Sequence, residues 1–107
     1  MHWIYILIAG VFEIGWPLGM KLSQTTGNRI LWLSISGISM LLSGIFLWMA
    51  QKQIPIGTAY AVWTGIGASG TFFAGILFFG ESQSMARYFF AGMILMGVIG
   101  LKLATKS

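Results

Sequence analysis

The chain contains no cysteine, and only 7% of its 107 residues are charged. The missing cysteines exclude a disulfide framework and a thiolate-ligated metal. Two acidic residues and one histidine, His2, also leave too few ligands for any other metal site. A soluble domain carries charge on roughly a quarter of its residues. The composition, which is 57% hydrophobic, therefore predicts an integral membrane protein.

Catalytic groups are also scarce. No paired acid and base and no activated nucleophile is visible, so we predict neither an enzyme nor a cofactor. The net charge of +4 comes from basic residues that lie singly in loops, which is typical of membrane-flanking anchors rather than of nucleic-acid binding. The N-terminus has no Lys- or Arg-bearing start, and Glu13 would interrupt its apolar run, so we expect no cleaved signal peptide.

Four long hydrophobic segments fill the chain, approximately 3–20, 30–50, 56–79 and 85–103. Roughly 20 apolar residues in a helix cross a hydrocarbon core of about 30 Å. Long apolar runs without alternation favour helices over strands. Pro55 stands where a helix can begin but an earlier one cannot continue. The sequence therefore predicts an all-α membrane protein, with residues 1–107 forming a single four-helix transmembrane domain.

The basic residues are evenly divided between the two sides of the membrane. Four spans place three on each side: Lys52, Lys102 and Lys106 against Lys21, Arg29 and Arg87. An excess of Lys and Arg in cytoplasmic loops normally sets the orientation, and here there is none. Either the orientation is weakly specified or the chain inserts both ways. Dual insertion would permit an antiparallel homodimer, which would double the few helices available to enclose a pathway.

Glu13 lies near the centre of the first hydrophobic segment. A charge near the bilayer midplane costs on the order of 3 kcal/mol even on the mildest insertion scale, so Glu13 is a functional-site candidate by default. Helical spacing places Gly10, Trp16 and Pro17 on its face. Trp16 can donate its indole N–H to the carboxylate, or it can be an interfacial belt residue. Pro17 has no N–H to donate to the Glu13 carbonyl, which leaves that carbonyl free as an acceptor. The free carbonyl is either part of the site or only the result of a helix kink.

The second and third segments offer polar partners for this acid. Three serines share one face of the second segment: Ser36, Ser39 and Ser43. They either bond back to their own helix or line a polar path. Tyr60 and Trp63 share a face of the third segment, and their O–H and N–H groups need acceptors when buried. We expect Ser43, Tyr60 and Trp63 to donate to Glu13. Low dielectric favours the neutral acid and hydrogen bonds favour the carboxylate, so the site can hold either protons or a cation.

These residues together resemble the small multidrug resistance family over essentially the whole chain. The resemblance rests on Gly10-Val11-Phe12-Glu13, on residues 55–68 (PIGTAYAVWTGIGA) and on residues 97–102 (GVIGLK). It implies a four-helix protomer, an antiparallel dual-topology homodimer and proton-coupled cation export across the bacterial inner membrane. It also implies that Glu13 binds substrate and protons alternately.

Within that family the chain is most similar to the guanidinium exporter branch, through Trp16, the 55–68 block and Lys102. The site residues of the branch carry over onto five positions: Glu13, Trp16, Ser43, Tyr60 and Trp63. One departure lies beside the acid, because Gly15-Trp16-Pro17 replaces the usual Val-Trp-Ala. Pro17 is therefore where we expect the substrate range to differ.

The leading hypothesis is a guanidinium/proton antiporter, because planar guanidinium carries a fork of donors that matches carboxylate oxygens. The main alternative is a broader exporter of quaternary ammonium cations, which would rely on aromatic faces. A small dual-topology ion channel is a third possibility, although Glu13 disfavours an anion pore. An accessory subunit is a fourth, and a paralogue could replace the second copy. Glu81 and Arg87 are interpreted as solvated loop residues without a role.

Overall fold

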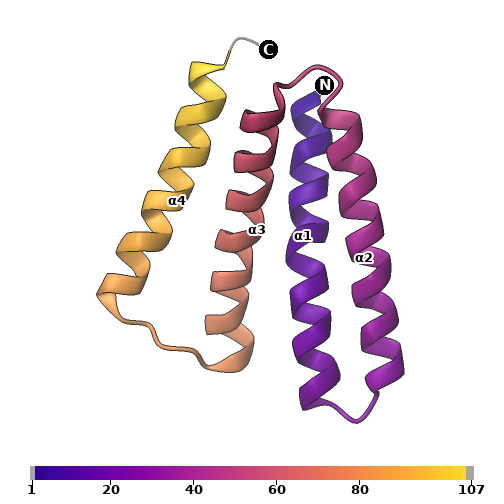
Figure 1. Ribbon diagram of the computed structural model, residues 1–107. Helices are drawn as coiled ribbons and strands as arrows, with labels where there is room; N and C mark the ends of the chain where they lie inside the picture. The colour runs from indigo at the N-terminus through magenta and orange to yellow at the C-terminus, as the bar shows by residue number, and fades with distance from the viewer. Residues whose placement is uncertain (1, 106–107) are drawn as a thin grey trace.

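The computed structural model describes residues 2–105, and Lys106 lies outside that range. The described chain forms α1 (His2–Thr25), α2 (Arg29–Ala50), α3 (Ile56–Phe79) and α4 (Met85–Ala104), joined by short loops (Figure 1). All four helices are long and apolar enough to cross a membrane. The expectation of an all-α protein with four membrane-spanning helices is therefore confirmed. The first helix runs past Met20, the expected end of the first span, to Thr25.

Local sequence signals explain where the helices begin and end. The Asn28 and Ser84 side chains accept backbone N–H groups in the first turns of α2 and α4, which otherwise lack partners. Pro55 precedes α3, where its missing N–H costs nothing. Gly80 ends α3 in the left-handed conformation with φ of 65°, which glycine adopts without strain. These local signals determine where the helices begin and end, which the hydrophobic runs alone would not do.

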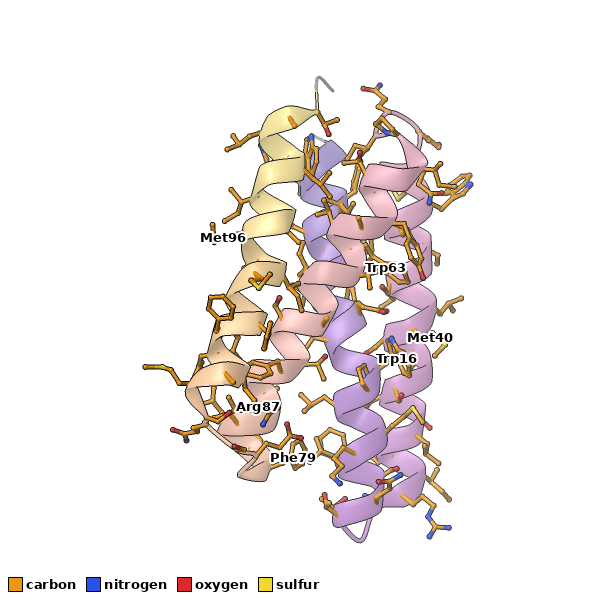
Figure 2. All side chains as sticks on the ribbon, turned by 60° about the vertical axis from the view of Figure 1, so that its left-hand side comes forward. Trp16, Met40, Trp63, Phe79, Arg87 and Met96 are labelled. Carbon is orange, nitrogen blue, oxygen red and sulfur yellow. The ribbon has the colours of Figure 1, made fainter. Side chains whose placement is uncertain are left out.

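The helices stand side by side in one layer, in the order α4, α3, α1, α2 (Figure 1). The principal dimensions of 46 × 34 × 17 Å describe a flat slab. Among the described residues α4 packs mainly on α3, and Ala91 is its only buried residue. Met40 on α2 and Met96 on α4 point away from the bundle (Figure 2). The slab thus leaves large apolar faces for lipid or for another protein.

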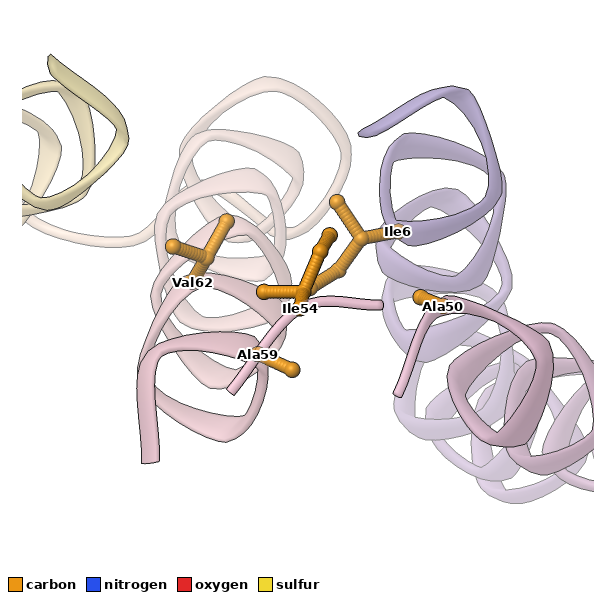
Figure 3. Close-up of a cluster of buried hydrophobic side chains, with 5 residues drawn as sticks. All are labelled: Ile6, Ala50, Ile54, Ala59 and Val62. Atoms are coloured by element: carbon orange, nitrogen blue, oxygen red, sulfur yellow. The ribbon is translucent and has the colours of Figure 1, made fainter. Parts of the chain in front are cut away.

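A small hydrophobic core closes the end of the slab at the α2–α3 connection. Five buried residues from three helices and the connection form it: Ile6, Ala50, Ile54, Ala59 and Val62 (Figure 3). Ile54 lies in the connection and is 1% exposed. This core fixes α3 against α1 at one end. It therefore helps to determine which residues of α3 lie beside Glu13.

Glycines let α1 and α3 approach closely. A Cβ on Gly10 would lie 2.5 Å from Cγ2 and 2.9 Å from Cβ of Ile66. A Cβ on Gly70 would overlap Ile14 in the same way. Small residues at helix interfaces permit such approach in membrane proteins, where dispersion contacts replace the hydrophobic effect. The α1–α3 contact is therefore built from glycines facing isoleucines.

We predict that Gly10→Ala destabilises the fold by about 1–3 kcal/mol, because the stiff β-branched Ile66 cannot move its Cβ without its backbone. Gly57→Ala is the matched control, since a Cβ at Gly57 meets nothing within 4 Å. The free energy of unfolding in mixed detergent micelles, followed by tryptophan fluorescence, measures both. Equal stability of the two variants would contradict the packing described for Gly10.

Candidate functional site

Glu13 lies in the middle of α1, half-buried against α3. Its stem occupies the space beside Gly67, where a Cβ would overlap the Cβ and Cγ of Glu13. Trp16, one turn further along α1, donates its indole N–H to Oε1 of Glu13 at 2.7 Å. The glycine thus makes room for the acid, and Trp16 orients one of its two oxygens.

An open pocket of about 280 Å³ adjoins the carboxylate. Residues of α1 and α3 line it: Glu13, Pro17, Thr64, Gly67, Ala68 and Thr71. Within residues 2–105 the one ion pair joins Arg87 to Glu81, so no basic side chain of the described chain neutralises Glu13. The pocket therefore combines an uncompensated carboxylate with the hydroxyls of Thr64 and Thr71. Such a group of acceptors can bind a proton or a small cation.

The other expected donors do not reach this carboxylate in the described chain. Trp63 donates its indole N–H to Oγ of Ser43 at 2.8 Å, and Ser43 donates to the carbonyl of Ala9 at 2.7 Å. Trp63 lies one helical turn, about 5.4 Å, before the level of Gly67, so its indole meets α2 instead of Glu13. Figure 2 shows Trp63 and Trp16 at successive heights of the bundle. The expectation that Ser43 and Trp63 donate directly to Glu13 is corrected accordingly.

Tyr60 is 57% exposed, and its ring centroid lies 5.4 Å from that of Trp63. No hydrogen bond joins its hydroxyl to Glu13 within the described residues, in contrast to the expectation. Gly10 is buried against Ile66 and packs the helices rather than lining the pocket. The structure thus brings Trp16 to Glu13, while the remaining expected site residues lie about one helical turn away, toward the α2–α3 connection.

The serine stripe of α2 faces α1 rather than an open path. Ser36 donates to the carbonyl of Trp16 at 2.6 Å. Ser39 is buried beside Gly15, where an added Cβ would lie 3.0 Å from its Oγ. The hydrogen bonds of Ser36 and Ser43 run between helices. These serines therefore neither bond back to α2 nor line a polar path, which were the two alternatives from the sequence. They join α1 to α2 and hold the helix that carries Glu13.

The sequence reasoning missed Thr64 and Thr71 as pocket residues. The face of the third segment that was expected to meet Glu13 carries Tyr60 and Trp63, whereas the face that lines the pocket carries Thr64 and Thr71. Residues spaced by three and four from Tyr60 include Thr64, Gly67 and Thr71. That spacing was readable in the sequence, but only the contact of Gly67 with Glu13 selects it.

Fold and site together define a small multi-pass membrane protein with an unpaired acid in one of its spans. Its sequence matches the profile of the Small Multidrug Resistance protein family over residues 1–103, so the chain belongs to that family. A relative named guanidinium exporter from Yersinia pseudotuberculosis is 49% identical over 105 residues, which cover 98% of this chain and 100% of the relative. Another of that name, from Citrobacter freundii, is 50% identical over 106 residues, covering 98% and 99%. The relatives carry transporter names, which supports transport and not catalysis.

We predict that Ser43→Ala lowers the free energy of unfolding by about 1–2 kcal/mol, because the Trp63 indole N–H loses its acceptor in an apolar surrounding. Ser34→Ala changes an exposed serine of the same helix and is the matched control. Both variants are compared by unfolding in mixed micelles. A Ser43→Ala protein as stable as the Ser34→Ala protein would show that this hydrogen bond does not hold α3 to α2.

Proposed function

We propose that this protein exports guanidinium or small guanidinyl cations in exchange for protons, with Glu13 binding the cation and protons alternately. One observation carries the proposal: Glu13 faces an open pocket with no basic partner in the described chain. A carboxylate in a membrane span needs a proton or a cation to offset its charge. Exchange of one for the other at a single site couples their movements.

The geometry suits guanidinium. The indole of Trp16 occupies Oε1, so Oε2 stays available to N–H donors from the pocket. Guanidinium presents such donors in a planar fork, and Thr64 and Thr71 add hydroxyl acceptors along the same wall. The relatives named guanidinium exporter support the same substrate class. Substrate and proton would compete for the same oxygen, as an antiporter requires.

A second copy of the chain completes the proposed transporter. The slab exposes apolar faces of α2 and α4, and the basic residues are balanced between the two membrane sides. Both features fit an antiparallel homodimer in the bacterial inner membrane, in which a second Glu13 would stand opposite the first. Two carboxylates would hold a guanidinium ion by opposite edges.

We predict that Glu13→Gln abolishes proton-driven guanidinium exchange while leaving the fold intact, because the amide neither titrates nor attracts a cation. Glu13→Asp is the control that keeps the charge, and we expect it to retain weakened exchange. Currents from proteoliposomes on a solid support, recorded across pH, measure both. Full proton-coupled guanidinium current in the Glu13→Gln protein would refute the proposal.

Substrate breadth is measured in the same assay. We expect currents with guanidinium and methylguanidinium that far exceed those with tetrapropylammonium, which offers no N–H donors to the carboxylate. Equal currents for all three cations would instead assign the broader quaternary ammonium export. Flux that ignores the proton gradient would point to a channel.

We predict that cysteines introduced singly at Gln24, in the last turn of α1, and at Gln53, in the α2–α3 connection at the opposite end of the bundle, are each accessible from outside in about half of the molecules. Balanced Lys and Arg leave the orientation undecided. The absence of native cysteine makes the labelling clean. Labelling of intact cells with an impermeant maleimide measures the two fractions. Complete labelling of one variant and none of the other would exclude dual insertion.

A further inference from the structure

A second pocket lies next to the Glu13 pocket, on the side of the loop after α3. It measures about 160 Å³ and shares Pro17 and Thr71 with the first. Its far end is lined by Lys21 and Glu81. We call the two pockets together the α1–α3 cleft. Lys21 lies roughly 12 Å along α1 from Glu13, at a rise of 1.5 Å per residue, so the cleft leads from the embedded acid to the loop after α3.

Glu81 lies in the loop after α3, and its exposed side chain folds back over the end of that helix. Its backbone N–H donates to the carbonyl of Gly75 at 3.2 Å. Its carboxylate covers Gly75, where an added Cβ would lie 2.6 Å from Cδ and 2.9 Å from Oε2 of Glu81. The glycine therefore lets the second acid of the chain lie at the mouth of the α1–α3 cleft. Glu81 is the exposed loop residue that the sequence predicts, whereas Arg87, which was also expected in the loop, lies in the first turn of α4.

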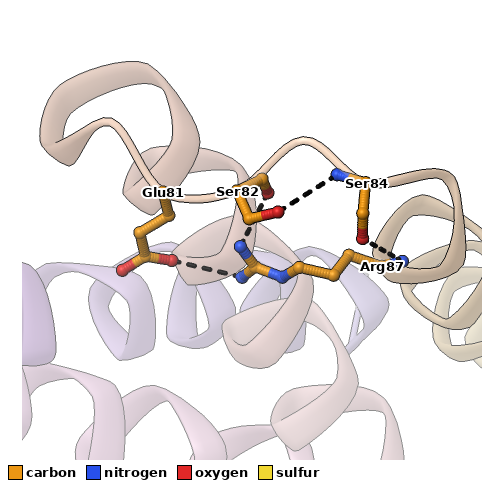
Figure 4. A network of polar contacts seen from close by, with 4 residues as sticks. All are labelled: Glu81, Ser82, Ser84 and Arg87. Carbon is orange, nitrogen blue, oxygen red and sulfur yellow. Dashed lines mark hydrogen bonds and ion pairs between the residues drawn. The ribbon is translucent and has the colours of Figure 1, made fainter.

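Glu81 already binds a guanidinium group in this structure. Nη2 of Arg87 lies 3.2 Å from Oε1 of Glu81, and Nη1 donates to the carbonyl of Ser82 at 2.7 Å (Figure 4). The two side chains are 34% and 47% exposed. Exposed ion pairs contribute little free energy, so another cation can displace the arginine at small cost. The pair shows that this carboxylate accepts the same chemical group that the proposed substrate carries.

We propose that Glu81 is a loading site for guanidinium-type cations at the mouth of the α1–α3 cleft, with the Arg87 side chain as its resident occupant. The inference rests on the proposed function, because it names a step before binding at Glu13. Lys21 lines the same mouth and repels an entering cation. Glu81 offsets that repulsion, and Thr71 lines both the pocket at the mouth and the pocket at Glu13.

The test compares Glu81→Gln with Arg87→Gln in guanidinium currents from proteoliposomes. We expect Glu81→Gln to raise KM by about two- to fivefold at low ionic strength, the range that an exposed ion pair supplies. We expect Arg87→Gln to lower KM, because it removes the competing occupant. Salt should shrink the difference from wild type, since exposed charges are screened beyond about 10 Å at 0.1 M.

The opposite signs separate a loading site from a structural latch. Both variants break the same ion pair, so equal increases in KM would overturn the proposal and assign the pair a purely structural role. An unchanged KM in Glu81→Gln would overturn it as well. Glu81→Gln combined with Gln83→Glu restores the charge of the loop at another position. We expect KM to stay raised, and a return to the wild-type KM would reduce the effect to diffuse charge.

Folding and the proposed function are checked separately. Glu81→Asp keeps the charge and should stay near the wild-type KM, which makes the series readable even if the amide variant folds poorly. Equilibrium binding of guanidinium, followed by isothermal titration calorimetry, should persist in Glu81→Gln. Absence of guanidinium current in the wild-type protein would refute the proposed function, whereas wild-type current with no effect of Glu81 refutes only the loading site.

Discussion

The structure depends on holding one acid inside an apolar helix. Glu13 has no basic partner in the described chain, and its position requires a tryptophan donor on its own helix and a glycine on the next. These two neighbours stabilise the acid in different ways. Trp16 supplies a hydrogen bond where water is scarce, and Gly67 supplies the volume that a side chain would fill. Any larger residue at position 67 would displace the acid from α3 and close its pocket.

The hydrogen bonds between helices follow from the same demand. Ser36 and Ser43 both donate to carbonyls of α1, one turn below and one turn above Glu13. Trp63 then donates to Ser43, which links α3 to the same pair. These bonds run across helices because lipid offers no competing partners. They hold α1 at two heights, so the acid is positioned by bonds that do not touch it.

Much of the fold could be predicted from the sequence, and less of the site. Long uncharged runs and the breaks at Pro55 and Gly80 define four helices without any knowledge of packing. Glu13 and Trp16 are neighbours on one helix, so their contact follows from spacing alone. The partner of Trp63 depends on how far α3 is shifted along α1 and α2, and no local pattern encodes that shift. Thr71 and Glu81 can be related to Glu13 only once the structure shows that two pockets share Pro17 and Thr71.

Pro17 is shared by those two pockets, so its departure from the family pattern changes the wall of both. Its ring lines both pockets, and it has no N–H to donate to the carbonyl of Glu13. The helix nevertheless continues to Thr25. A proline here therefore changes the wall of the α1–α3 cleft without ending the helix that bears the acid. On the proposed path from Glu81 to Glu13 every cation passes this rigid ring, so selection among cations can arise beside Pro17 as well as at Glu13.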